Sequence, residues 1–123
     1  MQNKKIILVI DDEKEMRTFL RDTLEQEGYE IIEAEDGFDG MEKFSANHVD
    51  LVITDLIMPR MEGVETITSL AAKHPSVKVI AISGAPYSDT YLKMVKKLGV
   101  CAGLEKPFSR REIVSTVTDV LPP

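Results

Sequence analysis

The segment VITDLIMP, residues 52–59, carries a single carboxylate, Asp55, within an otherwise apolar run. An ionised aspartate is almost never fully buried unless it is paired or bound to a metal, because desolvation disfavours the charged form. The apolar run continues through residues 56–58, and no helix pattern starts before Pro59, so a helix-capping role does not fit. If Asp55 is buried with its charge, it therefore needs a cationic partner.

Four more polar side chains stand at the ends of strand-like runs: Asp11, Asp12, Ser83 and Lys106. Taken singly, they have structural explanations, since Asp12 could cap a helix, Ser83 could belong to a turn and Lys106 could be a solvated surface lysine. Taken with Asp55, their shared position at the ends of strand-like runs favours one site.

Three converging carboxylates repel one another, so without a counter-charge at least one of them would have a raised pKa. Mg²⁺ fits this set, because it prefers oxygen ligands and is commonly held by one or two carboxylates together with phosphate oxygens. A zinc site is disfavoured because His48 and His74 are isolated, and we interpret both as surface residues. The carboxylate set indicates magnesium.

Beside a metal ion, Asp55 can act as a carboxylate nucleophile toward phosphorus and form an acyl phosphate. Lys106 would supply a positive charge to one phosphoryl oxygen, and the Ser83 hydroxyl can donate a hydrogen bond to another. The chemistry indicated is transfer of a phosphoryl group to Asp55.

Five strand-like apolar runs alternate with segments of helical period and would position these residues. The predicted strands are 6–10, 30–34, 51–54, 77–83 and 101–105. The first predicted helix spans 14–27, and four more lie around Met41, Ile67, Val95 and Val117. The acid-flanked second strand is typical of a sheet edge, whereas the β-branched third and fourth strands are typical of a sheet centre.

Each connection is long enough for a helical crossover, so we expect a parallel sheet covered on both faces, a doubly wound α/β fold. Ligands of such folds bind beyond the carboxyl ends of the strands. That is the edge at which Asp11, Asp12, Asp55, Ser83 and Lys106 are expected.

Composition limits the remaining possibilities. The 123 residues fit one domain, 1–123, and no run has the length of a membrane span or the flanks of a signal peptide, so we expect a cytoplasmic protein without membrane contact. The net charge of −6 argues against direct binding to nucleic acid. Cys101 has no partner for an internal disulfide, and we expect it to be buried.

Four motifs resemble those of the receiver domain of bacterial two-component response regulators, including the chemotaxis regulators: ILVIDDE (7–13), VITDLIMPRMEG (52–63), IAISG (80–84) and EKPF (105–108). The resemblance implies a flavodoxin-like (βα)5 fold with strand order 2-1-3-4-5. It also implies that Asp55 accepts a phosphoryl group from a phosphohistidine of a sensor histidine kinase or histidine phosphotransfer protein. The phosphorylated chain would act as a phosphorelay switch on a downstream protein target or output domain, and not as an enzyme with a separate substrate.

The resemblance further implies that Asp11, Asp12, Asp55 and the main-chain carbonyl of Ile57 bind Mg²⁺, and that the Lys106–Pro107 peptide is cis. One departure concerns Gly103, since an aromatic residue usually stands three positions before the lysine. We hypothesise that Ser83 and the loop through Pro86 move the following helix directly. Ile57 and Ala85 offer no side-chain hydrogen bond to an attacking water, which predicts slow hydrolysis of the acyl phosphate.

Three alternative functions differ from a phosphoacceptor switch in the residues that they need. A phosphohydrolase of the haloacid dehalogenase type needs a second aspartate two residues after Asp55, where Ile57 stands. A flavodoxin-like flavin binder needs a Ser/Thr/Gly-rich phosphate loop after the first strand, whereas DDEKE would repel a phosphate. A degenerate receiver that binds proteins without phosphorylation remains open, although the complete set of site residues weighs against it.

Overall fold

The computed structural model describes residues 4–56, 63–84 and 88–122. Five parallel strands form one sheet in the order β2-β1-β3-β4-β5. They are β1 (Ile6–Ile10), β2 (Glu30–Ala34), β3 (Leu51–Asp55), β4 (Lys78–Ser83) and β5 (Ala102–Glu105). The helices are α1 (Lys14–Glu25), α2 (Gly37–Ala46), α3 (Gly63–Lys73), α4 (Ser88–Lys96) and α5 (Arg110–Val120).

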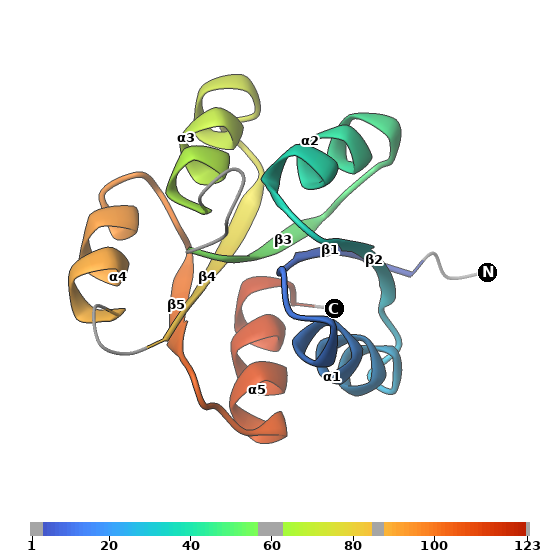
Figure 1. Ribbon diagram of the computed structural model, residues 1–123. Coiled ribbons are helices and arrows are strands. Elements are labelled where there is room, and N and C mark those ends of the chain that lie inside the picture. Colours follow the sequence, from blue (N-terminus) through green and yellow to red (C-terminus); the bar gives the residue numbers. More distant parts are fainter. Residues whose placement is uncertain (1–3, 57–62, 85–87, 123) are drawn as a thin grey trace.

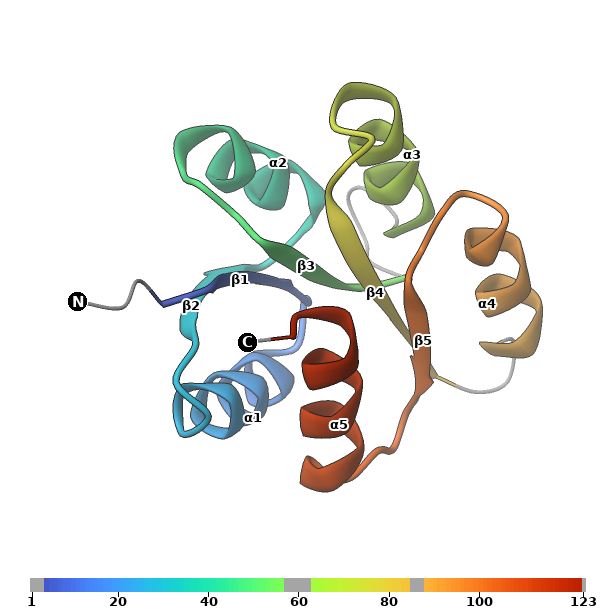
Figure 2. The same cartoon turned by 180° about the vertical axis from the view of Figure 1, so that it is seen from behind.

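Helices cover both faces of the sheet, as Figures 1 and 2 show from opposite sides. Helices α1 and α5 lie on one face, and α2, α3 and α4 lie on the other. The doubly wound α/β prediction and the strand order 2-1-3-4-5 are confirmed. The placement of β2 at an edge, and of β3 and β4 inside the sheet, is confirmed as well.

The two faces of β1 explain how one strand supports both layers. Ile7 and Val9 point to the face covered by α1 and α5, whereas Leu8 and Ile10 point to the other face, because successive strand residues alternate. All four side chains are at most 1% exposed. The strand that delivers Asp11 is therefore fixed by apolar packing on both sides.

Element boundaries shift by one or two residues from the sequence prediction. Helix α1 ends at Glu25, and a hydrogen-bonded turn follows in which Gly28 adopts a φ of +94°, a region that favours glycine. Strand β3 runs one residue further than predicted, because Asp55 pairs with Ile82 of β4. The site carboxylate thus belongs to the strand itself.

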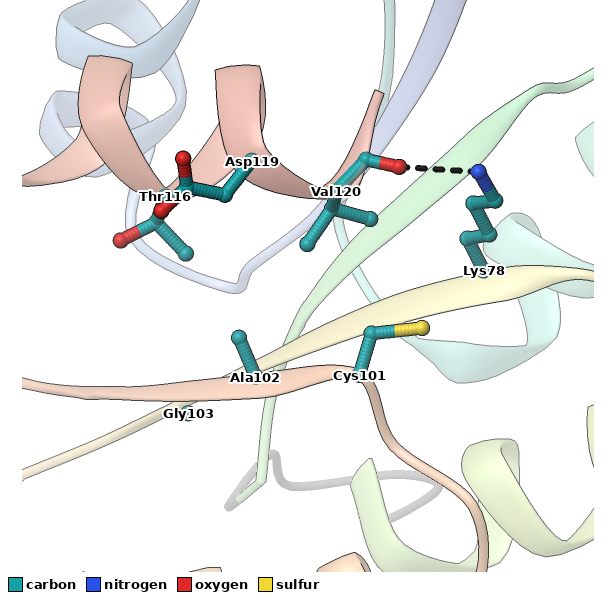
Figure 3. A pocket seen from close by; sticks show the side chains of 7 residues that line it. All are labelled: Lys78, Cys101, Ala102, Gly103, Thr116, Asp119 and Val120. Carbon is teal, nitrogen blue, oxygen red and sulfur yellow. Dashed lines mark hydrogen bonds between the residues drawn. The ribbon is translucent and has the colours of Figure 1, made fainter. Parts of the chain in front are cut away.

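The prediction that Cys101 is buried is wrong, since its side chain is exposed. Cys101 precedes β5, which is the edge strand of the sheet and, among the described strands, pairs with β4 alone. Val100 turns into the core, and the thiol lies in a hollow of about 480 Å³ beside α5. Figure 3 shows this hollow, where the Lys78 ammonium donates to the Val120 carbonyl at 2.9 Å. This hollow lies toward the amino ends of β4 and β5, away from the predicted site.

Within the part of the chain that the structure describes, no helix is both long and apolar enough to cross a membrane.

Candidate functional site

The carboxyl edge of the sheet carries the five described residues predicted for the site. Asp11 follows β1, Asp55 ends β3, Ser83 ends β4 and Lys106 follows β5. Asp12 begins the connection to α1 beside Asp11. Parallel strands bring these separate segments to one edge, as the doubly wound architecture requires.

The three aspartates form one acidic cluster. A carboxylate oxygen of each of Asp11, Asp12 and Asp55 lies within 4.8 Å of those of the other two. Asp11 is 1% exposed and Asp55 is 7% exposed, whereas Asp12 is exposed. The cluster therefore has a buried floor and one side that faces solvent.

Asp11 is held by its main chain and its carboxylate. Its N–H donates to the Ala34 carbonyl at 3.1 Å, and its Oδ1 accepts from the Glu13 N–H at 2.8 Å. Burial raises the pKa of Asp11 to about 6, with the nearby charge of Asp55 adding to the effect and the Glu13 N–H and Lys106 opposing it. The folded chain thus holds the Asp11 carboxylate where burial destabilises its charged form.

Backbone contacts fix the position of Asp55. The Thr54 hydroxyl donates to the Asp55 carbonyl at 3.0 Å, and the next residue's N–H, that of Leu56, donates to Ile82 at 2.9 Å. The first residue of α3, Gly63, packs so closely on this strand end that a Cβ there would overlap the Asp55 carbonyl oxygen. The end of β3 is therefore held in place by contacts with β4 and α3.

Lys106 neutralises part of the cluster. Its Nζ lies 2.8 Å from Oδ2 of Asp55, 3.0 Å from Oε1 of Glu13 and 3.3 Å from Oδ2 of Asp11. Burial lowers the pKa of Lys106, but the hydrogen bond to Asp55 and the charges around it raise that pKa well above its usual value. Lys106 is a partly buried, positively charged group directed at the carboxylates.

Ser83 is fully buried at the end of the strand next to β3. Its hydroxyl donates to the Gly84 carbonyl at 3.5 Å, a long hydrogen bond, and its own carbonyl accepts from the Lys106 N–H at 2.8 Å. The backbone of β4 therefore sets the position of Lys106, and the Ser83 side chain can reorient at low cost. The Lys106–Pro107 peptide is cis, as the resemblance implied.

Two predicted contributions lie outside the described residues: the Ile57 carbonyl as a metal ligand and the effect of Ile57 and Ala85 on hydrolysis. The two histidines excluded from the site are exposed, as predicted. His48 contacts Asp50 at 2.9 Å, and the His74 ring lies 4.6 Å from that of Phe44.

Sequence reasoning assigned no role in the site to Glu13, Thr54 or Gly63. Glu13 stands beside the two aspartates, so its carboxylate could have been considered as a partner of Lys106. Gly63 ends the VITDLIMPRMEG motif, where a glycine at the start of a helix indicates a close approach of another segment. Thr54 gave no signal beyond its β-branched side chain.

The donor set fits Mg²⁺. All donors are carboxylate oxygens, two of them on nearly buried side chains, and the exposed side leaves room for water and phosphate oxygens. Lys106 supplies one positive charge beside three clustered carboxylates, so these four groups carry a net negative charge when all are ionised. A divalent cation would offset that charge.

The chain matches the family model for the response regulator receiver domain over residues 7–118. The chain belongs to this family. It is 30% identical over 112 residues to the chemotaxis protein CheY of Listeria monocytogenes, which covers 90% of this chain and 93% of that protein. It is also 30% identical over 115 residues to the transcriptional regulatory protein CpxR of Escherichia coli K12, which covers 94% of this chain and 48% of CpxR.

This receiver domain also resembles solved structures over nearly its whole length. The response regulator TrrA of Thermotoga maritima, in complex with Mg²⁺ and BeF, has 32% sequence identity and a TM-score of 0.85, covering 95% of this chain and 99% of TrrA. The chain spans 48% of CpxR and only 8% of hybrid signal transduction histidine kinase D of Dictyostelium discoideum. A receiver domain is a signalling switch, and the acidic cluster is consistent with the magnesium site of such domains.

Proposed function

We propose that Asp55 is the phosphoacceptor of this receiver domain. The observation that carries the proposal is the 2.8 Å contact between Lys106 Nζ and Asp55 Oδ2 beside two further carboxylates. A carboxylate oxygen of Asp55 would attack the phosphorus of a phosphohistidine while the P–N bond breaks, and the electron pair of that bond would stay on the histidine nitrogen. An acyl phosphate on Asp55 results.

The surrounding groups have separate roles in this step. Mg²⁺, held by Asp11, Asp12, Asp55 and the Ile57 carbonyl, would offset the negative charge of the incoming phosphate. Lys106 would move its contact from Asp55 Oδ2 to a phosphoryl oxygen, and the Ser83 hydroxyl would leave its long bond to donate to another. The domain would thereby catalyse its own phosphorylation and dephosphorylation and no other reaction.

The proposed partners follow from the family and from charge. We propose that a sensor histidine kinase or histidine phosphotransfer protein supplies the phosphoryl group, since hybrid histidine kinases and transcriptional regulators are among the relatives. The response would pass to a downstream protein or an output domain. Residues 1–123 would form one cytoplasmic receiver domain, and the net charge of −6 disfavours direct contact with nucleic acid.

Intact-mass measurement after incubation with Mg²⁺ and acetyl phosphate tests the proposal. We expect a phosphate-sized mass gain in the wild-type chain and none in Asp55→Asn. Asp22→Asn, which changes an exposed aspartate of α1, is the matched control and should gain mass like the wild type. No gain in any variant would favour the degenerate receiver that binds proteins without phosphorylation.

A further inference from the structure

Arg17, on the first turn of α1, connects the acidic cluster to the edge strand β2. Its Nη1 donates to the main-chain carbonyl of Asp11 at 2.7 Å, and its Nε donates to Oε1 of Glu33 at 3.3 Å. The Arg17 side chain is 15% exposed and that of Glu33 is 28% exposed. One largely buried guanidinium thus holds two segments at once, with charge-assisted hydrogen bonds.

The contact with Arg17 completes a set of bonds around Asp11. The N–H of Asp11 is bonded to Ala34, its carbonyl to Arg17 and its Oδ1 to the Glu13 N–H. Bonds on both sides of Cα and on one carboxylate oxygen leave little rotational freedom. The remaining oxygen, Oδ2, accepts from the Lys106 ammonium at 3.3 Å, and Asp11 belongs to the acidic cluster.

Arg21, one helical turn further along α1, provides an internal comparison. Its Nε lies 2.6 Å from Oε2 of the same Glu33, and its Nη2 donates to the Ile31 carbonyl at 3.4 Å. These described contacts of Arg21 are with β2. Both arginines share a helix, a charge and an ion-pair partner, but the contact with the Asp11 main chain belongs to Arg17.

We propose that Arg17 is a positioning residue of the magnesium site, which fixes the Asp11 carboxylate by binding the Asp11 carbonyl and Glu33 together. The inference rests on the proposed magnesium site and adds to it a residue that touches neither metal nor phosphate. Groups that orient metal ligands from outside the ligand set often change metal affinity by about tenfold or more when they are removed.

Magnesium titration of the phosphate-free chain, followed by isothermal calorimetry or amide chemical shifts, tests this role. We expect Arg17→Ala to weaken Mg²⁺ binding about tenfold. Arg21→Ala should stay within about twofold of the wild type, since its contacts do not reach the main chain of a ligand. Arg17→Lys should lose only about threefold, because an ammonium can still donate to the Asp11 carbonyl.

The outcomes separate this inference from the proposed function. Wild-type affinity in Arg17→Ala, or an equal loss in Arg21→Ala, would overturn the positioning role while leaving the magnesium site intact. A wild-type chain that binds no Mg²⁺ would overturn both. If Arg17→Ala does not fold, the Mg²⁺ affinities of Arg17→Lys and Arg21→Lys are compared instead. We expect Arg17→Lys alone to bind Mg²⁺ more weakly than the wild type. Equal Mg²⁺ affinities of the two variants would overturn the positioning role.

Discussion

The ammonium of Lys106 lies 2.8 Å from the Asp55 carboxylate, although the two residues are separated by 51 positions in the chain. The ends of β3 and β5 meet at one edge of the sheet, with β4 between them. Lys106 is 18% exposed and Asp55 9% by side chain, so little water screens the pair. Lys106 is therefore the internal counter-charge of the site in the absence of metal.

Lys106→Met should destabilise the metal-free chain at neutral pH. Removing one partner of a mostly buried ion pair leaves uncompensated carboxylates, and we expect a loss of about 2 kcal/mol in the free energy of unfolding. Mg²⁺ should restore more stability to this variant than it adds to the wild type, because it supplies the missing charge. Urea unfolding with and without Mg²⁺ measures both effects.

Lys97→Met is the control for that comparison, since Lys97 is exposed and lies after α4. It should leave stability and its Mg²⁺ dependence unchanged. Equal stabilisation of the wild type and Lys106→Met by Mg²⁺ would contradict the counter-charge role of Lys106.

Asp11→Asn should raise the stability of the metal-free chain at neutral pH. The pKa of Asp11 is raised from 3.8 to about 6, so the folded state holds the proton more tightly than the unfolded chain between these values. The stability that Asp11 contributes is present below about pH 4 and falls as the pH rises through about 6. Asparagine stays neutral and can still accept from the Glu13 N–H, so the gain could reach about 3 kcal/mol at pH 7.5.

Urea unfolding in a chelator at pH 7.5 and pH 4 measures this difference. The gap between Asp11→Asn and the wild type should close toward pH 4, where Asp11 is protonated in the folded chain. Asp22→Asn should show no such gap, since Asp22 is exposed. A gap of constant size at both pH values would show that the effect is not the titration of Asp11.

Gly63→Ala should strongly destabilise the fold. A Cβ at Gly63 would overlap the Asp55 carbonyl oxygen and the Leu56 Cα, and backbone atoms cannot move aside as a flexible side chain can. We expect a loss of more than about 3 kcal/mol in the free energy of unfolding, which denaturant titration would measure. Gly84→Ala is the matched control, because a Cβ there meets nothing within 4 Å. Similar losses in both variants would contradict the close approach of α3 to β3.

The sequence predicted the strands and the acidic cluster because the relevant information is local. Runs of β-branched residues mark the central strands, and parallel connections bring strand ends to one edge. Ser109 caps α5, since its hydroxyl accepts from the Glu112 N–H at 3.1 Å, and a serine just before a helix is a local signal of this kind. The cap considered for Asp12 differs: α1 begins after Glu13, whose side chain makes no capping bond.

Other features depend on contacts between distant segments, which local patterns do not encode. The face on which Cys101 lies depends on the β5 edge and on α5, so its apolar neighbours were misleading. The bond from Arg17 to the Asp11 carbonyl requires a particular approach of α1 to the loop before it. The need for glycine at position 63 depends on how closely α3 packs against β3. Residue types and their spacing along the chain do not predict any of these contacts.

The missing aromatic at Gly103 has a structural counterpart in α4. A Cβ at Gly103 would lie 2.7 Å from Cδ2 of Leu92, so the leucine side chain occupies the space above the glycine. Contact between α4 and β5 at this point gives the fourth helix a direct connection to the strand that leads to Lys106. We therefore expect Leu92 to carry part of the response to phosphorylation.

Leu92→Ala tests this expectation. Addition of beryllofluoride and Mg²⁺, a mimic of the phosphoryl group, should shift the amide signals from Ser83 through Leu98 in the wild type and shift those of α4 less in Leu92→Ala. Phosphorylation of Asp55 by acetyl phosphate should be unchanged, since Leu92 lies outside the acidic cluster. Met94→Ala, at an exposed position of the same helix, is the control.

Gly103→Ala approaches the same contact from the strand. The new methyl group should push the flexible Leu92 side chain aside and cost about 1 kcal/mol of stability. In Leu92→Ala that cost should vanish, giving a coupling energy of about 0.5–1 kcal/mol in a double-mutant cycle measured by urea unfolding. Additive losses of stability would mean that the side chains at positions 92 and 103 are not in energetic contact. The response of α4 to phosphorylation would then have to start from Ser83 alone.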